Sequence, residues 1–358
     1  MKIAFLTRWN ATCGVSLHAE LLCRKLHSMG YDVQVFAPRL ISASRDWHHR
    51  KVKVRDEEWV SRIYDETTEI DYPYGGSIDD ALYEEDYDYL FVELYSKLPI
   101  LELVRKAEKL WRKSRLIGVI HVGYRRDIKP ILKISWNAIV IFDHRYYDGL
   151  LKGFDLTKVE RIEEIPYPFA IIRDAASIRP EFAENGELFF TYGRQPVSEY
   201  IDYIRALREL RGEFDLTYFV LRSDQNLPVN KTWIVQEVDR PSLTKIYGYL
   251  LGADIHLLPK GDSRGVVVSS TVCQCLYSGT PTIVPDTRYF EMMPVDERGF
   301  GPVVKYKPGD LNDLMEKIRL LIRDESLREM VSTRAREHAL KHSDEAVAKK
   351  VLNLINSL

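Results

Sequence analysis

One stretch of the sequence, residues 253–281, combines the residue types that bind anions in proteins. An apolar run ends at Pro259, a loop containing Gly261 follows, and a helical pattern covers 271–278. The basic and hydroxyl residues of this stretch are Lys260, Arg264, Ser269, Ser270 and Thr271. Free backbone N–H groups and the positive end of the dipole attract an anion at a helix start. The stretch therefore predicts a phosphate site, although a serine that only caps the helix explains the same hydroxyls.

Several familiar catalytic signatures are missing from the sequence. It contains no G-x-x-x-x-G-K-[ST], no H-E-x-x-H, no G-x-S-x-G, and no G-x-G-x-x-G after the first apolar run. The four cysteines, Cys13, Cys23, Cys273 and Cys275, have the spacing of neither a disulfide framework nor a zinc site. We expect them to be thiols without a chemical role, and we expect no metal site.

Alternating apolar runs and amphipathic segments predict the elements that position these residues. Residues 2–7 form a predicted strand, 8–14 a loop ending in Gly14, 15–29 a helix, and 32–36 the next strand. The pattern continues with predicted elements at 89–94, 98–113, 115–121 and 138–142. Strands that alternate with helices form parallel sheets that are covered on both faces.

A second series of strands and helices begins at residue 188, after a proline-bearing linker that follows 162–168. Its predicted strands are 188–192, 216–221, 232–235, 254–258 and 282–284, and its predicted helices are 197–211, 242–251, 271–278 and those from 310 onward. Residues 42–88 break the rhythm of the first series, and we interpret them as an insertion. Two α/β domains follow, and ligands of such sheets bind at the carboxyl ends of the strands.

Length and charge limit the partners of the protein. A chain of 358 residues favours two domains, and 51 basic against 53 acidic side chains argue against a nucleic-acid partner. No run of about 18 uncharged apolar residues occurs, so we expect a cytoplasmic protein. The basic run Arg45–Arg55 contains Trp47 and is a candidate contact for the inner membrane surface or for a phosphorylated acceptor. An ordinary exposed face is the more common explanation of such a run.

The second series resembles the donor domain of the retaining GT-B glycosyltransferases of group 1, the family of mannosyltransferases and sucrose-phosphate synthase. The resemblance rests on residues 253–281 with their closing Gly279-Thr280-Pro281, on 281–291, and on the Lys-Pro-Gly-Asp of 307–310. Gly193-Arg194 resembles the "GR" that opens this domain in the family. In the first series, Gly14 resembles the glycine of the loop after the first strand, and His121 the histidine of the family's "HG" motif.

The resemblance implies two Rossmann-like, doubly wound domains that face a central cleft. Residues 1–170 would form the acceptor-side domain and 175–335 the nucleotide-sugar donor domain, while 336–358 would be a helix that packs back on the first domain. The implied activity is transfer of a sugar from a UDP- or GDP-linked donor, with retention of configuration and without a metal or other cofactor. The acceptor would be a saccharide, a lipid-linked molecule or a small molecule.

The resemblance also implies roles for single residues. His121 and Arg194 would be catalytic, with Arg194 meeting the diphosphate charge that develops as the glycosidic bond breaks. An ordinary strand-end histidine is the alternative explanation of His121. The residues expected to bind the donor are Gly14, Gly193, Arg194, Lys260, Arg264, Ser269, Ser270, Thr271, Gln274 and Glu291.

Two departures from the family pattern affect the donor site. The glutamates of the family's E-x7-E element fall on Val266 and Gln274, so Asp262 or Glu291 would have to supply a carboxylate. Glu199 stands near the place of a family lysine that follows the "GR". A non-catalytic GT-B subunit that binds a sugar nucleotide or a partner is therefore an alternative. A metal-dependent GT-A enzyme that uses the D-x-D of residues 86–88 is another.

Overall fold

A computed structural model describes residues 1–43 and 54–358, which form two compact units. The first unit comprises Met1–Pro168, Gly265–Ser270 and Asp344–Leu358, and the second comprises Phe169–Arg264 and Thr271–Ser343. The basic run predicted to touch a membrane lies outside the described residues except for Val54 and Arg55. None of the helices in the two described ranges combines the length and apolar character needed to span a bilayer.

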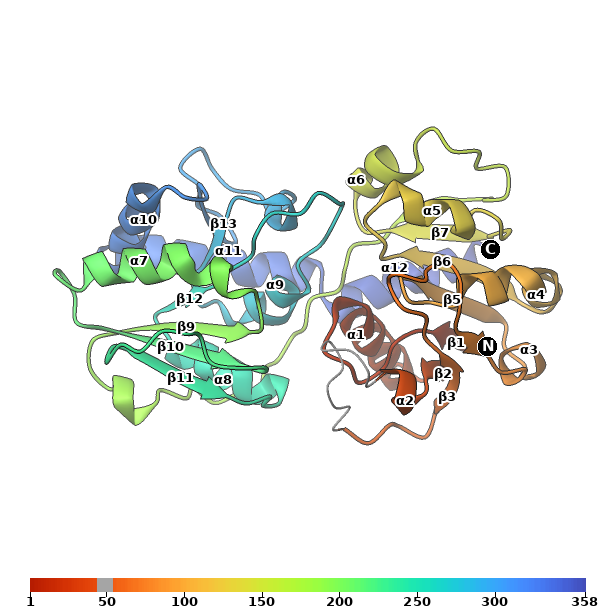
Figure 1. Ribbon diagram of the computed structural model, residues 1–358, viewed down its shortest axis with the longest axis horizontal. Helices are drawn as coiled ribbons and strands as arrows, with labels where there is room; N and C mark the ends of the chain where they lie inside the picture. The colour runs from red at the N-terminus through yellow and green to blue at the C-terminus, as the bar shows by residue number, and fades with distance from the viewer. Residues whose placement is uncertain (44–53) are drawn as a thin grey trace. The chain divides into compact units, whose positions relative to one another are not determined.

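The first unit is built on an eight-stranded sheet with the order β4-β3-β2-β1-β5-β6-β7-β8 (Figure 1). Neighbouring strands run parallel except β3 and β4, which are antiparallel. The strands are β1 (Lys2–Leu6), β2 (Asp32–Pro38), β3 (Val60–Asp65), β4 (Ser77–Ile78), β5 (Tyr89–Leu94), β6 (Arg115–Ile120), β7 (Ala138–Ile141) and β8 (Ile162–Glu164). The segment 42–88 thus supplies β3 and β4 to the sheet, and its interpretation as an insertion into the series of strands and helices is wrong.

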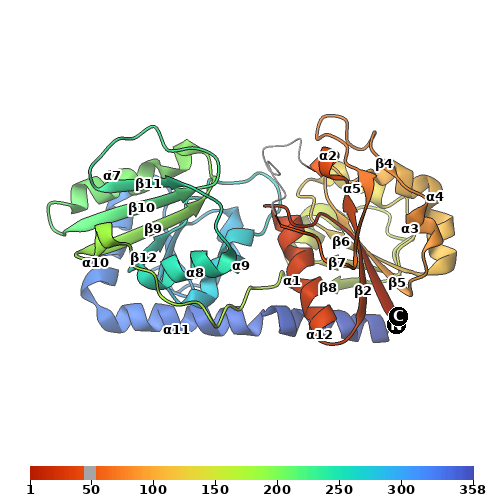
Figure 2. The same cartoon turned by 90° about the horizontal axis from the view of Figure 1, so that it is seen from below.

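Helices of the first unit follow the strands in the expected alternation. They are α1 (Gly14–Ser28), α2 (Leu40–Ala43), α3 (Ala81–Glu84), α4 (Ile100–Lys113), α5 (Arg125–Ile131), α6 (His144–Tyr146) and α12 (Asp344–Asn356). The apolar side of α1, including Leu22 and Leu26, is buried. The last helix, α12, packs beside α1, where Lys25 Nζ lies 3.8 Å from Asp344 Oδ2 (Figure 2). The final residues of the chain therefore complete the first unit.

The second unit is built on a six-stranded sheet of parallel neighbours with the order β11-β10-β9-β12-β13-β14 (Figure 1). The strands are β9 (Glu187–Gly193), β10 (Leu216–Arg222), β11 (Ile234–Val238), β12 (Ile255–Leu257), β13 (Thr282–Pro285) and β14 (Val304–Tyr306). The helices are α7 (Ile201–Leu210), α8 (Leu243–Gly252), α9 (Ser270–Cys275), α10 (Leu311–Arg323) and α11 (Glu325–Lys341).

Apolar cores cover both faces of the six-stranded sheet. Phe189 and Phe190 are consecutive on β9 and therefore point to opposite faces. Phe189 packs in a core with side chains of α7, α10 and α11, whereas Phe190 packs in a second core with Tyr247 and Leu250 of α8. This arrangement confirms the predicted class, an α/β protein with two Rossmann-like parallel-sheet domains. Of the four free thiols, three are buried, and Cys13 is partly exposed.

Candidate functional site

Arg194 and Lys260 reach the same edge of the second sheet because their strands are neighbours. β9 ends at Gly193 and is followed directly by Arg194, while β12 pairs in parallel with β9 and leads into Lys260. Gly193 has a φ of 126°, and a Cβ there would lie 2.7 Å from the Gln195 side chain. The turn after β9 therefore favours a glycine at this position.

The ammonium group of Lys260 lies among charged and aromatic groups. Its Nζ stands 4.5 Å from the centre of the Tyr289 ring. Burial lowers the pKa of Lys260; the charge of Glu199 raises it, and the charge of Arg194 lowers it again. Two cations and one carboxylate thus meet at the carboxyl end of the sheet, which leaves the cluster with a net positive charge.

Glu199 belongs to the short 3-10 turn Val197–Tyr200. A Cβ on Gly261 would lie 2.7 Å from Glu199 Oε1, so the carboxylate is packed against the loop that carries Lys260. Its other oxygen, Oε2, is buried without a hydrogen-bond partner among the described residues. The acidic residue at the place of the family lysine therefore faces a lysine supplied by another loop.

Arg222, the last residue of β10, holds the turn that carries Arg194. Its guanidinium donates to Gln195 O at 2.8 Å, to Gln225 O at 2.6 Å and to Asp224 Oδ2 at 2.9 Å. The residue is only 2% exposed. Sequence reasoning missed this residue, although an arginine at the end of an apolar strand was a visible signal.

The loop after Lys260 is tied to the segment 287–291. Arg288 N donates to Asp262 Oδ1 at 3.0 Å, and Arg288 Nη1 donates to Arg264 O at 2.9 Å. Arg264 and Glu291 are exposed, as is Asp262. Arg288 therefore fixes the backbone of Arg264 through its carbonyl oxygen, whereas the Lys260 side chain lies near Arg194.

The hydroxyl segment before α9 belongs to the first unit. Val266 N donates to Gly123 O at 3.0 Å, and Arg145 Nη2 donates to Val267 O at 3.2 Å. Ser269 is 1% exposed, and a Cβ on Gly14 would lie 3.4 Å from Ser270 Cβ. Gly14 and Ser270 are thus brought together, in the unit that does not contain Arg194 and Lys260.

The predicted helix 271–278 is shorter than expected. α9 has six residues, and a 3-10 turn, Leu276–Ser278, continues it to Gly279. Thr271, the first residue of the second unit after this boundary, accepts a hydrogen bond from Tyr192 Oη at its carbonyl oxygen, 3.3 Å away. Gln274 lies on α9 and is half-buried.

His121 follows β6 at the carboxyl edge of the first sheet. Its Nε2 forms a hydrogen bond with Glu93 Oε2, and His18 Nδ1 lies 2.9 Å from Glu93 Oε1. Glu93 is fully buried at the end of β5, and His18 comes from α1. Burial raises the pKa of the Glu93 carboxyl, but the two imidazoles together lower it to about 2. The first unit therefore buries a carboxylate anion between two histidine rings.

Glu93 and His18 were not predicted from the sequence. Glu93 was the sole charged residue of the predicted strand 89–94, which is the signal that was available. The alternative D-x-D precedes β5 instead of following it, and Asp88 Oδ2 there accepts a hydrogen bond from Lys2 N at 2.7 Å. Asp88 therefore lies at the strand edge opposite to the one that carries Glu93.

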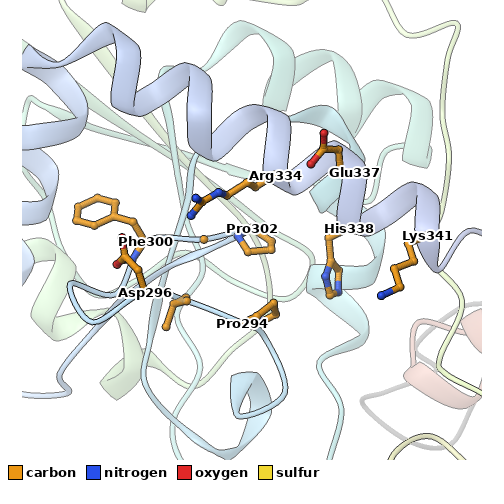
Figure 3. Close-up of a pocket in the computed structure, with 10 residues that line it drawn as sticks. Pro294, Asp296, Phe300, Pro302, Arg334, Glu337, His338 and Lys341 are labelled. Carbon is orange, nitrogen blue, oxygen red and sulfur yellow. The ribbon is translucent and has the colours of Figure 1, made fainter.

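A hollow of about 370 Å³ lies elsewhere in the second unit, between α11 and the loop 294–302 (Figure 3). Arg334, His338 and Lys341 line it from α11, and Asp296 and Phe300 from the loop (Figure 3). Burial lowers the pKa of His338 to about 4, with His342 and Lys341 acting in the same direction. The predicted donor-site residues are not among the described residues that line this hollow.

Comparison with solved structures defines the fold. HepE of Anabaena, solved in complex with UDP and glucose, is similar over 100% of both chains, with a TM-score of 0.65 and 12% identity. The chain has the GT-B fold. A glycosyltransferase from Rickettsia africae has a TM-score of 0.65 and 12% identity over 99% of this chain and 97% of its own.

A third similar structure is the pneumococcal O-GlcNAc transferase GtfA, solved in complex with UDP and GlcNAc. Its TM-score is 0.65, with 10% identity over 100% of this chain and 99% of its own. No protein-family model matches the sequence. The GT-B fold also differs from the GT-A architecture that the D-x-D alternative required.

Proposed function

We propose that the protein is a glycosyltransferase that transfers a sugar from a nucleoside-diphosphate donor to an acceptor hydroxyl. The observation that carries the proposal is that two cations, Arg194 and Lys260, lie near each other at the carboxyl ends of β9 and β12. Open α/β sheets bind their ligands at this edge. The similar structures HepE and GtfA were solved with UDP. A uridine diphosphate sugar is accordingly the donor that we propose.

Arg194 and Lys260 would bind the diphosphate and stabilise the negative charge that develops on it as the glycosidic bond breaks. Cations held in place before the reaction are effective because they need no reorganisation during it. Lys260 would supply the ammonium group that the group 1 family carries after its "GR", where this chain has Glu199. Two protein cations thereby replace a metal ion in this proposal, and the resemblance to group 1 supports retention of configuration.

Gln274 and His121 have proposed roles as polar contacts to hydroxyl groups. The side-chain amide of Gln274 offers the nucleotide sugar an NH2 group that donates hydrogen bonds and a carbonyl oxygen that accepts them. His121 offers its second ring nitrogen to a sugar hydroxyl. Gly14, Ser269, Ser270 and Thr271 remain proposed contacts to the nucleotide sugar, as do the exposed Arg264 and Glu291.

Isothermal titration calorimetry with UDP, GDP, ADP and TDP tests the binding part of the proposal. We expect UDP to bind with the highest affinity and binding to persist in EDTA. The absence of heat with every nucleotide, in protein shown to be folded by circular dichroism, would refute the proposal.

A non-catalytic GT-B subunit is the second candidate function. The observation that favours it is the occupation of the E-x7-E positions by Val266 and Gln274, which lack carboxylates. Mass spectrometry of the products formed from a panel of UDP-sugars separates the candidates. Release of free UDP and sugar, even without an added acceptor, identifies an enzyme and rules out the non-catalytic subunit.

A further inference from the structure

The buried carboxylate of Glu93 lies between two imidazole rings in the first unit. His18 approaches one carboxylate oxygen from α1, and His121 approaches the other from the loop after β6. The side chains of Glu93, His18 and His121 are 0%, 3% and 7% exposed. A charge buried so completely is stable only when its hydrogen-bonding capacity is used. The two rings provide that for Glu93.

The packing around the three groups is aromatic. Phe142 lies 5.0 Å from the His121 ring and 5.2 Å from the His18 ring, measured between ring centres. Tyr167 lies 5.3 Å from the His18 ring. These contacts hold both imidazoles against the carboxylate, so their orientation is fixed by packing as well as by hydrogen bonds.

A metal ion is the other explanation of two histidines and one carboxylate. Their candidate ligand atoms lie within 4.8 Å of one another. Ligands at about 2.0–2.2 Å from a tetrahedral zinc ion stand roughly 3.3 Å apart. Here each imidazole nitrogen contacts a different carboxylate oxygen. This arrangement fits two hydrogen bonds to one carboxylate better than three ligand atoms around one metal ion.

We propose that Glu93 is the positioning residue of His121, which it holds with a proton on Nε2 so that Nδ1 is the acceptor presented to a substrate hydroxyl. An ionised carboxylate only accepts hydrogen bonds, so the ring nitrogen that contacts it must carry the proton. The other nitrogen of a neutral imidazole then has a free lone pair. Among the described residues Nδ1 of His121 makes no hydrogen bond within the protein.

The inference rests on the proposed function, because it concerns how His121 meets a sugar hydroxyl. Burial lowers the pKa of His121, which favours the neutral ring, while Glu93 raises it and His18 and Arg8 lower it further. The neutral form is the one that offers an acceptor at Nδ1. Glu93 therefore selects the tautomer, and burial keeps the ring neutral.

Long-range ¹H–¹⁵N NMR spectra of ¹⁵N-histidine-labelled protein test the tautomer without any assay of activity. His121 is identified by the signal that disappears in His121→Asn. We expect a single Nε2–H tautomer in the ligand-free protein and a mixture in Glu93→Gln, because the glutamine has only one carbonyl oxygen for two rings. An Nδ1–H tautomer, or stoichiometric zinc in the purified protein, would overturn the inference while leaving nucleotide binding intact.

Kinetics provide the second readout. We expect Glu93→Gln to lower kcat/KM at least about tenfold, because loss of the carboxylate that fixes a histidine tautomer leaves part of the protein in the wrong tautomer. The acidic limb of the pH profile should move to lower pH, since the variant no longer raises the pKa of His121. A limb that stays in place would mean that Glu93 has a structural role alone.

Glu66→Gln is the matched control for the loss of a buried carboxylate. Glu66 is 4% exposed in the same unit and binds Arg8 at 2.5 Å instead of a histidine. We expect this variant to lose stability while the His121 signal keeps the wild-type tautomer. A mixture of tautomers in both variants would show that the effect in Glu93→Gln is nonspecific, and it would overturn the inference.

Discussion

Replacement of Lys260 by glutamine should weaken UDP binding without unfolding the second unit. Lys260 is half-buried, and its ammonium group lies near Arg194 and Glu199 at the carboxyl ends of two neighbouring strands. A hydrogen bond to a charged group contributes about 1.5–3 kcal/mol. At tenfold for each 1.4 kcal/mol, the loss corresponds to an increase in Kd of about 10- to 150-fold.

Stability should change little in this variant because two effects oppose each other. Loss of the ammonium group removes its attraction to Glu199 and also its repulsion from Arg194. Lys245→Gln is the matched control, since Lys245 Nζ lies 5.7 Å from the Tyr249 ring in the same unit, just as Lys260 stands over Tyr289. We expect the control to bind UDP with wild-type affinity and to melt at a similar temperature.

The pH dependence of binding gives an independent check. The pKa of Lys260 is lowered in the free protein, and a bound diphosphate would raise it, so binding takes up a proton once the free lysine is deprotonated. UDP affinity should therefore fall as pH rises through the lowered pKa, and this fall should be absent in Lys260→Gln. Calorimetry that finds equal Kd values for wild type and variant from pH 7 to 9.5 would refute the role of Lys260.

Four further variants test the contributions of single polar and charged side chains to the stability of the two units. Arg222→Lys loses the planar fork that holds the turn of Arg194, and urea denaturation should show a loss of about 2–4 kcal/mol; wild-type stability would contradict that role. Burial lowers the pKa of His256 to about 3, whereas a histidine in the unfolded chain has a pKa of about 6.5. Between these values only the unfolded chain is protonated at this residue, so stability falls as the pH drops below about 6.5. His256→Phe should flatten this decline by about 3 kcal/mol between pH 7 and 4 in chemical denaturation, and an unchanged slope would exclude the histidine as its source. Glu66→Gln should cost about 3–5 kcal/mol in the same assay, because a buried arginine loses its partner, whereas Asp80→Asn at an exposed ion pair should melt as wild type does.

The strands of both sheets were largely readable from the sequence. A run of apolar residues at 89–94 predicted β5 with the observed bounds, and the strand predicted at 188–192 falls within β9. β3 and β4 were missed because their segment is polar and tyrosine-rich. Only the last part of β3 is buried, so its strand character depends on pairing with β2.

The sequence was sufficient for the fold class and for the residues that end each strand, because hydrophobic periodicity reports which backbone segments are buried. It therefore indicated Arg194, Lys260 and His121 as residues at strand ends. Which of them meet was set by the order of strands in each sheet. Glu93 contacts His18 and His121, which are 75 and 28 residues away in the chain, and Lys260 faces Glu199 from a different loop. Contacts of this kind form between chain segments that are distant in sequence and pack side by side. A local sequence pattern does not predict which distant segments meet.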